Sequence, residues 1–265
     1  MTDFPAFLDI EGSREAGVLF ICDHASNAVP PEYGDLGLSV EQFQRHIAWD
    51  IGAADMTRRL AAIFGAPAVL STFSRILIDP NRGEDDPTLV RKIYDGAIVP
   101  GNADADEAEI ERRRARFFRP YRAAILARIA AMQASGRAPA IVSLHSFTPA
   151  MRGVARPWEI GFLWDIDDRL ARPLVEAFRA QGAPTGDNEP YDGALEGDTI
   201  DATATRLGLA NVLVETRQDL IATRAGAEGW ADRLAKALAP LLERPEIREV
   251  RHYGSRAGAL RRFAR

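Results

Sequence analysis

Short apolar runs alternate along the chain with longer stretches in which apolar residues recur at helical spacing. The apolar runs predict strands at about 17–22, 68–71, 76–78, 140–144, 159–164 and 212–214. The longer stretches predict helices at about 39–65, 104–135, 167–181 and 220–242. Strands that alternate with helices are typical of a largely parallel sheet with helices on its faces, so we expect an α/β fold.

Local signals mark the ends of some of these elements. Ser39 followed by Gln42 is a capping-box pattern for the start of a helix, and Gly65 suits the left-handed position that ends one. The segments 81–102 and 187–197 read as long irregular loops. Loops of that length are usually functional or disordered, so both are of interest for a binding site.

Three predicted strands end in residues that can bind a metal. His24 follows the run 18–22, His145 follows the run 140–144, and Glu215 follows Val212-Leu213-Val214. In an open α/β sheet, ligands bind beyond the carboxyl ends of the strands. Two neutral imidazoles and a carboxylate are a common ligand set for a catalytic zinc with an open position for water. The alternative is that each histidine is a hydrogen-bonded residue at the rim of the sheet.

A third metal ligand can come from the predicted helix 39–65. His46 and Asp50 are one helical turn apart and can share a face. We expect Asp50, or in second place His46, to be the ligand, with the other member orienting it; a local hydrogen bond between the two is the alternative. Asn27 lies three residues after His24, where zinc peptidases have a glutamate. Because an amide oxygen is a poor zinc ligand, we expect Asn27 to stabilise the loop or contact substrate.

A group of polar residues near the predicted strand 76–78 suggests recognition of an acidic substrate. Arg75 precedes this strand, and Asn81 and Arg82 follow it. Arginine binds a carboxylate at two points, and asparagine adds a neutral donor and acceptor. The alternative is that Arg82 forms an ion pair with a nearby acid, of which the sequence offers Asp79, Glu84, Asp85 and Asp86.

Glu215 is the candidate general base or acid. Burial at the end of an apolar run tends to raise the pKa of a carboxylic acid toward a useful range. A structural salt bridge to Arg217 is the alternative, because residues i and i+2 of a strand share a face. Ser26, Ser143 and Ser146 lie near the histidines, but none has the Gly-x-Ser-x-Gly setting of a serine hydrolase.

Composition narrows the class of protein. We expect one domain over residues 1–265, with 245–265 as a basic, solvated tail. The net charge of −5 gives no general attraction for nucleic acid, and no stretch reaches the roughly 18 consecutive apolar residues of a membrane span. The N-terminus has no basic region followed by an apolar stretch, so we expect a cytoplasmic location.

The single cysteine has two interpretations. Cys22 excludes an internal disulfide and fits a reducing compartment. It lies two residues before His24, which raises the alternative of a thiolate nucleophile. A cysteine that ends an apolar run is, however, usually a small buried hydrophobic residue.

Five segments, taken in order, resemble the N-formylglutamate amidohydrolase family. They are Cys22-Asp23-His24-Ala25-Ser26-Asn27, Ala48-Trp49-Asp50-Ile51-Gly52-Ala53, residues 74–82 (SRILIDPNR), Ser143-Leu144-His145-Ser146-Phe147, and residues 212–217 (VLVETR). This family is similar in fold to zinc carboxypeptidases and aspartoacylases. The resemblance therefore implies a zinc carboxypeptidase-like (phosphorylase/hydrolase-like) single domain with a mostly parallel mixed sheet.

The resemblance also implies roles for individual residues. His24, His145 and Asp50 would bind zinc or another divalent metal, Asn81 and Arg82 would hold the substrate carboxylate, and Glu215 would activate water. The implied activity is hydrolysis of the amide bond of an N-formyl or N-acyl amino acid such as N-formylglutamate, a reaction connected with histidine degradation.

Two other functions stay open at this point. One is an amidase that acts on acylated peptides or cell-wall fragments, and the other is a non-catalytic carboxylate-binding protein on the same scaffold. In each case the expected partner is a small molecule or fragment with a carboxylate, without nucleic acid or membrane, and formation of a homo-oligomer is left open.

Overall fold

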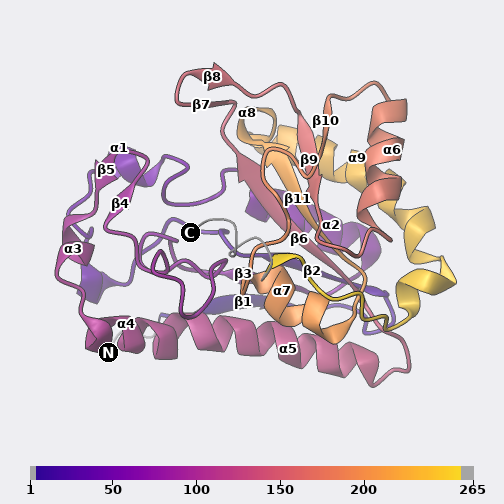
Figure 1. The fold of residues 1–265 in the computed structure, drawn as a ribbon, viewed down its shortest axis with the longest axis horizontal. Coiled ribbons are helices and arrows are strands. Elements are labelled where there is room, and N and C mark those ends of the chain that lie inside the picture. The colour runs from indigo at the N-terminus through magenta and orange to yellow at the C-terminus, as the bar shows by residue number, and fades with distance from the viewer. Residues whose placement is uncertain (1–3, 258–265) are drawn as a thin grey trace.

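A seven-stranded sheet forms the centre of the computed structural model, which describes residues 4–257 (Figure 1). Its strands are β1 (Phe7–Ile10), β2 (Val18–Cys22), β3 (Ala68–Ser71), β6 (Ala140–Phe147), β9 (Ile160–Leu163), β10 (Thr185–Asp187) and β11 (Asn211–Arg217). Their order across the sheet is β1-β3-β2-β6-β11-β9-β10. The β1–β3 and β9–β11 pairs are antiparallel, and the other neighbours are parallel. The chain is a single α/β domain with a mostly parallel mixed sheet, as the sequence predicts.

Helices cover both faces of this sheet. The helices α2 (Ala53–Phe64), α6 (Ala171–Ala180) and α9 (Arg224–Leu242) pack on one face, and α5 (Arg119–Gln133) and α7 (Thr199–Thr203) pack on the other (Figure 1). Alternate residues of a strand point to opposite faces. In β6, Val142 and Leu144 therefore join the core under α2 and α9, whereas Ile141 joins the core under α5.

Smaller elements surround the carboxyl ends of the strands. The two-stranded hairpins are β4 (Ile93–Tyr94) with β5 (Ala97–Ile98), and β7 (Ala150–Met151) with β8 (Val154–Ala155). The short helices are α1 (Val40–Phe43), α3 (Pro100–Ala103), α4 (Glu107–Arg113) and α8 (Gln218–Ile221). A π-helical turn over Arg114–Phe118 joins α4 to α5, so the predicted helix 104–135 is largely confirmed. Within residues 4–257, no helix has the length and apolar character needed to cross a membrane.

The predicted continuous helix at 39–65 is wrong in its middle. Its ends are confirmed, because Ser39 and Gln42 form a capping box and Gly65 ends α2 in the left-handed conformation. Between them, the chain leaves the helix over residues 44–52. The Asp50 N–H donates to the His24 carbonyl instead of to a helical partner, at 2.9 Å. Gly52 then turns the chain with a φ of 81°, and a Cβ there would lie 2.0 Å from the Ile221 carbonyl oxygen.

The predicted strand at 76–78 is also wrong. These three residues are buried among apolar side chains, but they form a turn. Side chains satisfy their carbonyl groups in place of a neighbouring strand: the Asn102 amide donates to Ile76 at 2.8 Å, and Arg113 donates to Leu77 at 2.9 Å. An apolar run thus identified a buried segment but not its backbone conformation.

The sequence did not predict the two strands at the edges of the sheet. Both β1 and β10 are short and lie at the two ends of the sheet.

The predicted basic tail is partly anchored to the domain. Arg256, assigned to this tail, forms ion pairs with Asp165 and Asp192 at 3.2 and 2.9 Å. The last arginines of that tail, Arg261, Arg262 and Arg265, lie outside the described residues.

Candidate metal centre

The three chemically important segments lie at the carboxyl ends of three neighbouring strands in the middle of the sheet. β2 ends two residues before His24, His145 lies within β6, and Glu215 lies within β11. β6 is the neighbour of both other strands, and in the parallel β6–β11 ladder Glu215 is the direct partner of His145. Residues paired in a ladder point to the same face, so Glu215 and His145 lie side by side on the face that α5 covers.

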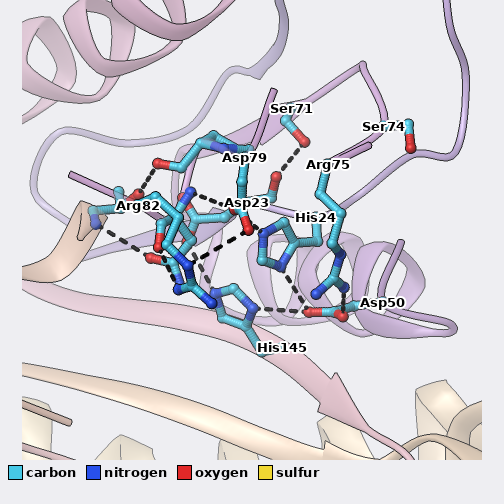
Figure 2. A network of polar contacts seen from close by, with 12 residues as sticks. Asp23, His24, Asp50, Ser71, Ser74, Arg75, Asp79, Arg82 and His145 are labelled. Carbon is cyan, nitrogen blue, oxygen red and sulfur yellow. Dashed lines mark hydrogen bonds and ion pairs between the residues drawn. The ribbon is translucent and has the colours of Figure 1, made fainter. Parts of the chain in front are cut away.

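Asp50 joins the two histidines in a buried group (Figure 2). One ligand atom from each of His24, Asp50 and His145 lies within 4.8 Å of the other two. The Asp50 Oδ2 atom is 3.3 Å from the His24 Nδ1 atom and 2.8 Å from the His145 Nδ1 atom. Asp50 reaches this position because the loop at 44–52 is fixed by the hydrogen bond from its N–H to the His24 carbonyl.

Each histidine is oriented by a second carboxylate on its other nitrogen (Figure 2). The His24 Nε2 atom lies 2.7 Å from Asp79 Oδ1, and the His145 Nε2 atom lies 2.9 Å from Asp23 Oδ2. Such an acid fixes the ring and holds the proton on the nitrogen that faces it, which leaves the other nitrogen as a ligand. Both rings therefore present Nδ1 to the centre of the group.

The His24 ring is neutral at physiological pH because its pKa is lowered. Burial and the charge of Arg75 lower the pKa of His24 to about 3. Burial works against ionisation of Asp79, but the His24 ring and the Arg82 guanidinium hold the pKa of Asp79 below its usual range. Asp23 behaves in the same way: burial opposes its charge, but the hydrogen bond with His145 lowers its pKa.

This arrangement fits a cation. A neutral ring with its proton on Nε2 has only a lone pair on Nδ1, so His24 and the Asp50 carboxylate face each other as two acceptors. Two acceptors in contact repel unless a proton or a metal ion lies between them. Two imidazole nitrogens with one carboxylate are a donor set that zinc and other divalent transition metals bind.

Asp50 has two further neighbours. Arg75 forms a buried ion pair with its Oδ1 atom, and the His46 Nδ1 atom lies 3.3 Å from the same oxygen. The second Arg75 nitrogen donates to the Tyr94 hydroxyl at 3.4 Å. Arg75, predicted as a substrate-binding residue, is thus committed to Asp50, while His46 lies outside the group of three ligand atoms.

The predicted substrate clamp is next to this group. Asn81 is buried, and its side-chain oxygen accepts from the Thr199 N–H at 3.2 Å. Arg82 is partly exposed, donates to the Asn81 carbonyl at 2.9 Å, and lies 3.9 Å from Asp79. Asn27 donates to the Phe43 carbonyl at 2.9 Å, which supports a role in stabilising the loop.

Glu215 is a buried acid with a free oxygen. Among the described residues, its Oε2 atom is buried and has no hydrogen-bond partner. Burial raises the pKa of Glu215, although the charges of His145, Arg75 and Arg156 act against this effect. The alternative salt bridge to Arg217 is not formed, because Arg217 pairs with Asp219 at 2.8 Å.

The alternative nucleophiles do not lie in a reactive setting. Cys22 is buried under α2, and burial raises the pKa of its thiol to about 12. Ser143 donates to Asp23 at 3.1 Å, and Ser26 accepts from the Ala28 N–H at 3.1 Å. The Ser146 hydroxyl is buried without a hydrogen-bond partner in the described part of the chain. Within residues 4–257, none of the three serine hydroxyls forms a hydrogen bond with a histidine ring.

The sequence reasoning missed the orienting role of Asp23 and Asp79. Asp23 was visible as the immediate neighbour of His24, yet it contacts His145 on another strand. The sequence offers Asp79 only as one of several acids near Arg82, yet its shortest contact is with His24. A carboxylate next to a candidate ligand was the available signal, although the pairing depends on how the strands meet.

Comparison with known proteins gives a family and two similar solved structures. The family model for N-formylglutamate amidohydrolase matches residues 16–222. A gene product of Agrobacterium tumefaciens is 35% identical with a TM-score of 0.83, and the match covers 91% of this chain and 97% of that one. An N-formylglutamate amidohydrolase from Ralstonia eutropha JMP134 is 23% identical with a TM-score of 0.62, over 89% and 97% of the two chains. No curated protein matches the chain.

Proposed function

Because the chain belongs to the N-formylglutamate amidohydrolase family, hydrolases that act on a linear amide bond, we propose that it is a metal-dependent enzyme cleaving the amide of an N-formyl or N-acyl amino acid. N-formylglutamate is the first substrate to test, since it is the substrate in the name of the family and of the structure from Ralstonia eutropha. The observation that carries this proposal is the placement of Glu215, with its free carboxylate oxygen, beside the buried His24–Asp50–His145 group.

In this proposal, His24, Asp50 and His145 hold a divalent metal, with zinc as the first choice. When bound there, such an ion would polarise the amide carbonyl and lower the pKa of a water molecule. Asp23 and Asp79 keep the two rings in the orientation that presents Nδ1 to the centre. Arg75 holds the second oxygen of Asp50, so that the other oxygen faces the histidines.

Glu215 transfers the protons of the reaction. Its carboxylate accepts a proton from the attacking water and gives that proton to the amine nitrogen as the carbon–nitrogen bond breaks. The acid returns to its ionised form, and the products are a carboxylic acid, formic acid for a formyl substrate, and a free amino acid. A raised pKa suits this role, because a general acid and base works best when its pKa is near the operating pH.

Asn81 and Arg82 hold the α-carboxylate of the substrate. Arg82 has one guanidinium nitrogen on the Asn81 carbonyl and only a distant contact with Asp79, so it can accept a further carboxylate. This clamp positions the amide at the centre, and such positioning can lower a reaction barrier by several kcal/mol.

The test is a substrate panel with protein that has been stripped by a chelator and then reloaded with zinc. We expect formate release from N-formylglutamate by the reloaded protein and none by the stripped protein. The panel includes N-acetylglutamate, acylated dipeptides and cell-wall muropeptides. It therefore also detects an amidase that acts on acylated peptides or cell-wall fragments. Reloaded protein that turns over no member of the panel would contradict the proposal and favour a carboxylate-binding protein.

A further inference from the structure

Among residues 4–257, one buried cation near the metal centre forms no ion pair with an acidic residue. Among residues 4–257, four arginines are buried: Arg75, Arg113, Arg156 and Arg169. Three of them form ion pairs, with Asp50, Glu109 and Asp167 respectively. Arg156 forms no ion pair with a carboxylate in the described part of the chain, although it is only 8% exposed. A buried charge is costly unless it is paired, so this site favours an anion.

The contacts of Arg156 are weak ones. Its Nη1 atom donates to the carbonyl and the hydroxyl of Thr148 at 3.4 and 3.3 Å, which are long hydrogen bonds. Its Nη2 atom lies 2.9 Å from the Met151 sulfur, a poor acceptor. The Tyr191 hydroxyl is a further hydrogen-bonding neighbour of Arg156. None of these groups is an ionised carboxylate, so the positive charge of the guanidinium is left for an anionic ligand.

Aromatic rings hold the guanidinium in place. Its central carbon lies 5.0 Å from the centre of the Tyr191 ring and 5.6 Å from that of the Phe147 ring. Stacking on aromatic faces stabilises a cation and fixes its plane. The backbone is fixed as well, because the Arg156 N–H donates to the Pro149 carbonyl at 2.9 Å across the base of the β7–β8 hairpin.

The hairpin places this cation beside the end of β6, the strand that carries His145. Phe147 lies two residues after His145 in β6, so both side chains point to the same face of the sheet. Glu215, the ladder partner of His145, is also on that face.

We propose that Arg156 is a specificity-determining residue that binds the side-chain carboxylate of an N-acylated acidic amino acid. The proposal rests on the proposed function and deepens it: Asn81 and Arg82 take the α-carboxylate, and Arg156 takes the second one. The two cations lie at different parts of the centre, because Arg82 is near Asp79 whereas Arg156 lies over the ring of Phe147, two residues after His145 in β6. A dicarboxylic substrate supplies the anion that Arg156 lacks within the described chain.

The kinetic test compares N-formylglutamate with N-formylglutamine, which has the same shape but a neutral side chain. In the zinc-loaded protein, Arg156→Gln should lower kcat/KM for N-formylglutamate by about 100-fold, mainly through KM, because it removes one partner of a buried charge pair. The loss with N-formylglutamine should be less than about 3-fold. Arg156→Lys, which keeps a charge without the planar fork, should retain part of the preference.

A matched control and a binding measurement separate the outcomes. Arg152→Gln changes an exposed arginine at the turn of the same hairpin and should preserve the preference for the charged substrate. Calorimetry with glutarate and with its monoamide, 4-carbamoylbutyrate, measures carboxylate binding without turnover. Glutarate should bind Arg156→Gln about 10-fold or more weakly, with little change for the monoamide.

Each result decides the assignment. An unchanged preference for N-formylglutamate over N-formylglutamine in Arg156→Gln, or equal losses with both substrates, would overturn it. If the wild-type protein hydrolyses neither substrate, the proposed function fails, and the glutarate titration alone decides whether Arg156 binds a carboxylate. If Arg156→Gln does not fold, as judged by its thermal unfolding, the same ratio in Arg156→Lys decides.

Discussion

The two faces of the central sheet differ in the kind of residue that the strands present to them. In β6, Val142 and Leu144 pack against apolar side chains under α2 and α9, whereas His145, one residue further, points to the face under α5. On that second face, the apolar layer stops at Ile141 and Leu213, and the ends of the strands carry His145 and Glu215. One face stabilises the fold, and the end of the other carries the chemistry. Neighbouring residues should therefore fail in different ways when they are changed.

The largest effect is expected for the polar face at His145. Replacing it with alanine removes one ligand and the partner of Asp23, so we expect turnover to fall by at least about 1000-fold. Metal content per chain, measured by elemental analysis, should fall in parallel. The control is His252→Ala, which changes an exposed histidine. A His145→Ala protein with full activity would refute the mechanism.

Glu215 should affect turnover without affecting the metal. Glu215→Gln keeps the size of the side chain but cannot transfer a proton, so kcat should fall by about 100- to 10,000-fold. Metal content and KM should stay close to those of the wild type. Asp219→Asn, at an exposed acid nearby, is the matched control. Loss of metal in Glu215→Gln would instead make Glu215 a ligand.

Leu144 tests the apolar face. Leu144→Ala leaves a cavity in the core under α2 and α9, and we expect the free energy of unfolding to fall by about 2–5 kcal/mol. Chemical denaturation measures this loss. The folded fraction should still bind one equivalent of metal, because no ligand has changed. Loss of metal from folded Leu144→Ala protein would show that the two faces are not separable.

Asp198 provides the last test, which measures how the free energy of unfolding depends on pH. Burial raises the pKa of Asp198 to about 7, from 3.8. The folded state then holds a proton that the unfolded state releases, so the stability contributed at this position falls as the pH rises from about 4 to about 7. The Asp198 side chain caps α7 by accepting from the Asp201 N–H at 2.7 Å. Asp198→Asn, which keeps this cap, should gain up to about 4 kcal/mol over wild type at pH 8 and nothing at pH 4. Equal stability differences at both pH values would contradict the raised pKa.

The sequence predicted those parts of the fold in which apolar pattern and backbone agree. The strands predicted at 17–22, 140–144 and 212–214 are confirmed as β2, β6 and β11, because each is a mainly apolar run. β6 and β11 continue beyond the predicted ends and include His145 and Glu215. The run 76–78 looked the same, but side chains from Asn102 and Arg113 satisfy its backbone in a turn. A single sequence does not show such distant hydrogen-bond partners.

The same limit applies to the site. The sequence predicted that His24, His145 and Glu215 come together, because each lies near the carboxyl end of a predicted strand. The pairing of Asp23 with His145 and of Asp79 with His24 depends on the path of the connecting loops. Arg156 gave no signal, because the sequence does not show that an arginine is buried or that it lacks an acidic partner within the described part of the chain.

The central claim is that His24, Asp50 and His145 hold one metal ion, and anomalous diffraction at the zinc absorption edge tests it most directly. A crystal grown with zinc should give a peak within bonding distance of both Nδ1 atoms and an Asp50 oxygen. Full activity of the zinc-loaded protein with no peak at that position, or with the peak on other residues, would contradict the account.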